Sequence, residues 1–281
     1  MNKNSNLYIV LYSVVMVVIV AVLLSVTALS LQPRQKSNEL DEKKTAILKS
    51  LGKVDEKGNA AVEYDKYVNA YAVDAKGNVI DGIGQDAVLE MLFDLKGAIA
   101  NGTFPVFESV DGQYVFPVTG NGLWDVIWGY VALENNLNVV AGVVLDHKGE
   151  TPGLGAEIAT KKHQEQYKGK EIFKGDKFVS IKLVKGGAKE PLYQVDAITG
   201  GTKTSDGVTE MLKSGLENYL PFINAKRAAA VSACRECAKE CSGDCNNCLC
   251  GCESVTEDVA PAEEVTPVEE GAVQENTESN E

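Results

Sequence analysis

The stretch Asp196-Ala-Ile-Thr-Gly-Gly-Thr-Lys-Thr-Ser205 lies where a predicted strand meets a predicted helix. Apolar residues around Val195 predict a strand that ends there, and the Gly200-Gly201 pair predicts a sharp turn. A helix is expected to begin near Ser205, capped by Thr204 or Ser205. Its apolar positions recur at helical spacing and predict a buried stripe: Val208, Met211, Leu212, Leu216, Tyr219 and Leu220.

Thr202 stands on the turn before this helix. The free N–H groups and the positive dipole end of a helix start favour an anion at such a place. Thr202 is therefore placed to hold a phosphate or to be esterified to one. A plain capped strand-to-helix turn is the alternative interpretation of the same residues.

Two other loops contain glycines that permit close approach of a ligand to the backbone. The first is Glu150-Thr151-Pro152-Gly153-Leu154-Gly155, which follows a predicted strand and precedes a predicted helix. The second is Gly122-Leu123-Trp124, in which Trp124 either flanks an aromatic ligand or belongs to the core. The Glu150–Gly155 segment could also be an ordinary loop.

The remaining signals predict an α+β domain, because strands alternate with helices and tight turns. The expected strands are 67–73 with 79–80 as a hairpin, 114–118, 137–145 and 178–183, and the expected helices are 154–167 and 208–220.

The N-terminal part of the chain predicts a membrane anchor. After a short segment, residues 1–6, the run 7–31 has 25 residues and no charge, which is long enough to span a bilayer. A cleaved signal peptide is the alternative, but its apolar region is shorter. Residues 32–55 predict an amphipathic connector helix. The flanking Lys and Arg residues leave the orientation of the anchor undecided.

The C-terminal part differs in composition from the domain. All seven cysteines lie in the segment 231–252, at a spacing that matches neither a ferredoxin nor a two-pair zinc ribbon. Disulfides and a thiolate metal site both remain open for them. The tail 253–281 has ten carboxylates and no Lys or Arg, and it is expected to be disordered. The net charge of −13 excludes a basic nucleic-acid footprint.

The run from Asp196 to Thr202 resembles the flavinylation motif D-x-x-[S/T]-G-A-T of FMN-binding domains. That family includes the C subunit of the sodium-translocating NADH:quinone oxidoreductase and the G subunit of the related Rnf complex. The loop Glu150–Gly155 matches the family's E-T-P-G-L-G, and Gly122-Leu123-Trp124 matches the G-L-W segment typical of the C subunit. The resemblance covers about residues 1–225. Gly201 departs from it, because the family usually has Ala there.

The resemblance implies FMN joined by a phosphoester to Thr202, with a separate flavin transferase supplying the FMN. It implies an electron-carrying subunit of a sodium-exporting translocase that is inactive alone and is anchored in the cell inner membrane. The FMN-binding domain, 56–230, would then lie on the periplasmic side. No catalytic residue and no metal ligand is predicted. The predicted cofactor-binding residues are Thr202, Asp196, Thr199, Gly200, Gly201, Thr204, Glu150, Thr151, Gly153, Leu154, Gly155 and Trp124.

Two alternatives remain beside this interpretation. One is the flavoprotein subunit of an Rnf-type electron-transport complex. The other is a membrane-anchored binding module whose Cys-rich tail sequesters metal, with the motif turn purely structural.

Overall fold

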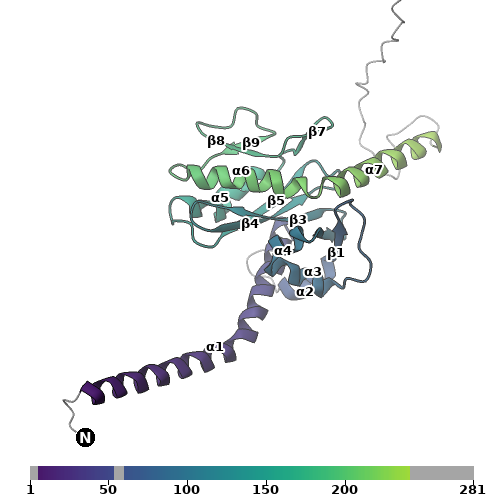
Figure 1. Ribbon diagram of the computed structural model, residues 1–281. Helices are drawn as coiled ribbons and strands as arrows, with labels where there is room; N and C mark the ends of the chain where they lie inside the picture. Colours follow the sequence, from purple (N-terminus) through teal and green to yellow (C-terminus); the bar gives the residue numbers. More distant parts are fainter. Residues whose placement is uncertain (1–5, 54–59, 241–281) are drawn as a thin grey trace, which may run out of the picture. The chain divides into compact units, whose positions relative to one another are not determined.

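The computed structural model describes residues 6–53 and 60–240 (Figure 1). The chain divides into two units, Met1–Val231 and Ser232–Glu281. The predictions for the acidic tail and for the cysteines from 241 onward lie outside the described residues. Cys234 and Cys237 fall within the last helix, α7 (Leu220–Glu240).

Helix α1 (Asn6–Ser50) is one continuous helix of 45 residues, coloured purple in Figure 1. The connector predicted over 32–55 is helical through Ser50 and continuous with the apolar run, since the helix passes through Pro33 without ending. An 18-residue window of α1 reaches a mean hydropathy of 3.0 and is wholly exposed. Near the end of the helix, Ile47 and Leu48 are buried against the domain.

A five-stranded antiparallel sheet forms the centre of the domain, with the strands in chain order. Strand β3 pairs with β4 through eight residues but with β2 through only two. The strands are β1 (Val68–Asp74), β2 (Thr103–Ser109), β3 (Tyr114–Asn121), β4 (Val126–Leu133) and β5 (Val140–His147).

Shorter elements complete the domain. The remaining strands are β6 (Phe173–Lys174), β7 (Lys177–Phe178), β8 (Lys182–Val184) and β9 (Gln194–Asp196). The remaining helices are α2 (Ala60–Tyr67), α3 (Gln85–Glu90), η1 (Met91–Phe93), α4 (Leu95–Ala100), η2 (Gly155–Ala159), α5 (Lys161–Gln164), η3 (Glu165–Tyr167) and α6 (Thr202–Glu217). The predicted α+β class is confirmed.

Alternating side chains place a core on each face of the sheet. Phe116 and Val118 of β3 pack on the α6 side, and Val115 packs on the side of α1. Figure 1 shows α6 lying across the sheet. Gly207 and Gly215 bring α6 close to β3, because a Cβ at Gly207 would overlap the Asn121 carbonyl oxygen and one at Gly215 would lie 2.7 Å from Val118 Cγ1.

Several predicted elements differ in extent. The expected hairpin partner 79–80 is only a single bridge between Val73 and Val79. The strand expected at 137–145 is β5, which begins later because Leu137 has a φ of 54°. The strand expected at 178–183 is broken into β7 and β8 because Ser180 has a φ of 58°.

The helix expected at 154–167 is three short pieces, η2, α5 and η3. Thr160 interrupts them, because its backbone is extended and its hydroxyl caps α5 by accepting from the His163 N–H. The helix expected at 208–220 is longer at its start and ends at Glu217. Pro221 lies four residues after Glu217, so in a continuous helix its ring would clash with the Glu217 carbonyl. Pro221 therefore separates α6 from α7.

Candidate functional site

Three loops meet at the N-terminus of α6. They are the β3–β4 loop, the β5–η2 loop and the β9–α6 turn, which contain the three sequence motifs. They enclose a hollow of about 130 Å³. The residues that line it are Leu123, Glu150, Thr151, Leu154, Gly155, Gly200, Gly201, Thr202, Lys203 and Thr204.

The start of α6 differs from the prediction. Thr202 is the first helical residue, and Gly201 is the N-cap, which provides no side-chain hydrogen bond. The predicted caps are therefore wrong. The Thr204 hydroxyl donates to Glu150 Oε2 at 2.6 Å, and the Ser205 hydroxyl donates to the Gly201 carbonyl at 2.9 Å.

This helix start suits an anion. The first backbone N–H groups of a helix have no intrahelical acceptor, and at α6 the N-cap has no side chain to satisfy them. The half-buried Thr202 lies on that first turn and lines the hollow. Its hydroxyl is therefore close to donors that a phosphate could use.

Glu150 joins the three loops. Its side chain is 4% exposed, and its Oε1 accepts the Trp124 N–H at 2.9 Å while its Oε2 accepts the Thr204 hydroxyl. Burial alone would raise the pKa of Glu150. Hydrogen bonds from Thr204 and from the backbone of the 123–125 loop outweigh burial and hold the pKa below its ordinary value. The side chain is therefore a carboxylate at neutral pH.

Apolar side chains flank the hollow. Leu123, Trp124 and Leu154 are 53%, 70% and 42% exposed. Large apolar side chains exposed together at one place indicate a binding surface. Trp124 is not in the core, so the core interpretation of this residue is wrong.

Not every predicted site residue lines the hollow. Thr199, Gly153 and Trp124 are exposed beside it, although the Trp124 backbone is tied to Glu150. Asp196 has a structural role, because its Oδ1 accepts the Ala188 N–H at 2.8 Å and stabilises the loop between β8 and β9.

Two lining residues, Leu123 and Lys203, were not among the predicted cofactor-binding residues. Both lie inside quoted motifs, so their positions were available from the sequence. Lys203 is exposed and adds a positive charge next to Thr202.

Gly201 has a packing reason for being glycine in this chain. Its φ of −105° is open to any residue, but a Cβ would lie 2.9 Å from Ile198 Cγ2 and 3.1 Å from Ile198 Cβ. The neighbour that a methyl group would crowd is thus Ile198, which is packed against the core.

We expect Gly201→Ala to lower the free energy of unfolding by about 1 kcal/mol, because overpacking forces Ile198 to move. Adding Ile198→Ala should make the double variant less destabilised than the sum of the two single changes. Thermal unfolding of the four proteins measures this coupling. Additive effects would show that Ile198 is not what Gly201 accommodates.

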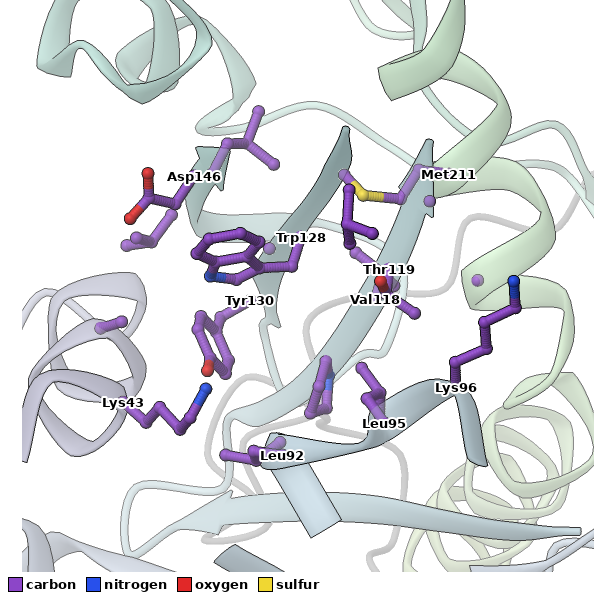
Figure 2. Close-up of a pocket in the computed structure, with 18 of the residues that line it drawn as sticks. Lys43, Leu92, Leu95, Lys96, Val118, Thr119, Trp128, Tyr130, Asp146 and Met211 are labelled. Atoms are coloured by element: carbon purple, nitrogen blue, oxygen red, sulfur yellow. The ribbon is translucent and has the colours of Figure 1, made fainter. Parts of the chain in front are cut away.

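A larger cavity lies elsewhere. It has a volume of about 1200 Å³ and is bounded by α1, α4, α6 and the β3–β5 strands. Figure 2 shows Trp128 and Tyr130 on one wall, with Lys43 and Lys96 projecting from other sides. It is lined by neither Thr202 nor the Glu150–Gly155 loop, so the chemistry of the motifs belongs to the smaller hollow.

A hydroxyl on an open helix start, beside an exposed apolar rim, suits a phosphorylated aromatic cofactor. Consistent with this, the FMN-binding domain family model matches residues 122–217. The fold and the site thus define an FMN-binding domain.

The chain is similar to the C subunit of the Na(+)-translocating NADH-quinone reductase from Vibrio anguillarum, with 33% identity over 208 residues, covering 67% of this chain and 81% of the relative. The corresponding protein of Neisseria meningitidis serogroup A is 28% identical over 233 residues, covering 75% of this chain and 90% of the relative. The chain belongs to the family formed by the C subunits of Na(+)-translocating NADH-quinone reductases.

Solved structures agree. The crystal structure of the C subunit from Parabacteroides distasonis matches with a TM-score of 0.63 and 35% identity, covering 69% of this chain and 96% of that one. NqrC from Shewanella oneidensis matches with a TM-score of 0.59 and 30% identity, covering 68% and 99%. The resemblance inferred from the motifs is confirmed.

Proposed function

We propose that this chain is the electron-carrying C subunit of a membrane-bound Na(+)-translocating NADH-quinone reductase and that it carries FMN as a phosphoester on Thr202. The observation that supports this most is the position of Thr202. It is the first residue of α6, it lines the hollow, and it lies at a helix start, where free N–H groups favour an anion.

The residues of the site fit FMN. The phosphate would lie at the start of α6, within reach of the free N–H groups, with the positive charge of Lys203 nearby. Leu123, Trp124 and Leu154 offer the exposed apolar surface that an isoalloxazine ring needs. Thr151 and Gly155 line the hollow between these two parts.

FMN would supply the redox chemistry, by accepting electrons and passing them on. The chain itself holds the phosphate, orients the ring and shields one side of it from water. Attachment needs only the Thr202 hydroxyl. A flavin transferase would move FMN from FAD to that oxygen, so that a P–O bond to Thr202 forms, the pyrophosphate bond of FAD breaks and AMP leaves with the proton.

Helix α1 would anchor the chain once in the cell inner membrane. Its apolar part is exposed, and its Ser13, Thr27 and Ser30 hydroxyls donate to carbonyls of the same helix, which satisfies them without water. We propose that the FMN-binding domain, 56–230, lies on the periplasmic side. Sodium export would belong to the assembled complex with its other subunits.

The proposal predicts that the purified full chain, loaded with FMN, has no appreciable NADH:quinone turnover. Its flavin should nevertheless be fully reducible by dithionite. The reason is that the proposed attachment at Thr202 supplies one flavin, and none of the three motifs forms the G-x-G-x-x-G turn of a dinucleotide site. Absorbance at the flavin band measures the reduction of the flavin, and absorbance at the NADH band measures turnover. Robust turnover by the isolated chain would contradict its role as a subunit.

A further inference from the structure

The carboxylate of Glu150 lies between two segments that are far apart in sequence. It accepts the Trp124 N–H from the β3–β4 loop and the Thr204 hydroxyl from the first turn of α6. Glu150 itself belongs to a third segment, the β5–η2 loop. The buried carboxylate therefore ties together all three loops of the hollow.

Two glycines make room for this carboxylate. A Cβ at Gly122 would overlap Glu150 Oε1, and a Cβ at Gly155 would overlap Oε2. The backbone of both loops thus packs directly on the two oxygens. Gly122 of the G-L-W segment and Gly155, the last residue of E-T-P-G-L-G, consequently have a shared packing reason, which is contact with one side chain.

We propose that Glu150 is the positioning residue of the flavin site, holding the loop that bears Leu123 and Trp124 against the helix turn that bears Thr202. This inference rests on the proposed function. It also adds a role to the one predicted for Glu150, because a residue that lines the flavin site would at the same time fix the ring-binding rim relative to the point of attachment.

The negative charge of Glu150 has a second consequence. Glu150 lines the same hollow as Thr202, so its carboxylate would lie close to a cofactor attached at Thr202. Negative charge nearby disfavours the addition of electrons to the flavin. Removing that charge should raise the midpoint potential, an effect that a purely structural residue would not have.

The loop-fixing role is tested on the full chain without flavin. Amide hydrogen exchange at Trp124 should become about tenfold faster or more in Glu150→Ala, because its acceptor is lost. Glu157→Gln is the matched control, since it removes one negative charge from the neighbouring η2 without touching the hollow. The control should exchange at the wild-type rate.

The flavin-positioning role is tested on the full chain co-expressed with a flavin transferase. Glu150→Ala should lower the rate of FMN attachment at least about tenfold, because Thr202 and the rim are no longer held together. Glu150→Gln preserves the shape and an acceptor oxygen, so it should attach FMN and show a raised midpoint potential. The midpoint potential of Glu157→Gln should stay closer to the wild-type value than that of Glu150→Gln.

Wild-type exchange at Trp124 in Glu150→Ala would overturn the proposal, and so would a Glu150→Gln potential equal to that of the wild type. If Glu150→Ala does not fold, Glu150→Gln still decides the question through its potential. Failure of the wild-type chain to gain FMN would contradict the proposed function instead, and the exchange measurement would still decide whether Glu150 holds the loop.

Discussion

Thr202→Ala should lose the whole FMN mass increment that the unmodified sequence gains when the full chain is co-expressed with a flavin transferase. We expect the loss of FMN to be complete, because the phosphoester needs a side-chain oxygen that Ala does not have. The change leaves the helix start in place, since Thr202 is already helical and its side chain makes no cap. Intact-mass measurement of the purified chain gives the result directly.

Two controls accompany this variant. Thr202→Ser keeps a hydroxyl at the same place and should still gain FMN. Ser214→Ala removes a hydroxyl from the exposed surface of the same helix, where it donates to the Glu210 carbonyl, and should gain FMN as the unmodified chain does. An FMN increment that persists in Thr202→Ala would move the attachment point to another residue.

Phe116→Ala should lower the free energy of unfolding by about 3–5 kcal/mol. Phe116 is fully buried on the face of the sheet that α6 covers. The centroid of its ring lies 5.0 Å from the ring centroid of Tyr219 and 6.3 Å from that of Phe222. Its removal would leave a cavity between β3 and the helices that follow the site. Thermal unfolding of the detergent-solubilised full chain measures the loss.

Phe93→Ala is the matched control, because this residue is 37% exposed and the Lys36 and Lys43 ammonium groups lie over its ring. Its removal should cost about 1 kcal/mol or less. Equal destabilisation by the two changes would show that the packing of Phe116 against Tyr219 and Phe222 does not hold α6 on the sheet.

The site could be located from the sequence but its internal bonding could not. The three motifs identified the three loops, and the structure brings all of them to one hollow. Local rules assigned Thr204 and Ser205 to helix caps, whereas Thr204 bonds to Glu150, 54 residues away. A contact over that separation depends on how the fold brings the loop between β5 and η2 to the first turn of α6, which short-range patterns do not contain.

The elements of the fold also differ in how far local sequence patterns predict them. Strand β3 follows from a short run of apolar residues and the buried stripe of α6 follows from helical periodicity, and both were predicted. Strand β2 was not predicted, and it contains Pro105, a residue that cannot donate a hydrogen bond to the sheet. Pro105 is tolerated because β2 pairs there with β1 alone, and its two pairs with β3 lie further along, at Phe107 and Glu108.

The most direct test of the central claim is a peptide map of the full chain after co-expression with a flavin transferase. Trypsin should release residues 190–203, which contain the hydroxyls of Tyr193, Thr199 and Thr202. We predict that this peptide carries one FMN and that fragmentation places it on Thr202. FMN on Thr199 or on a different peptide, or a flavin that separates from the chain on denaturation, would contradict the account.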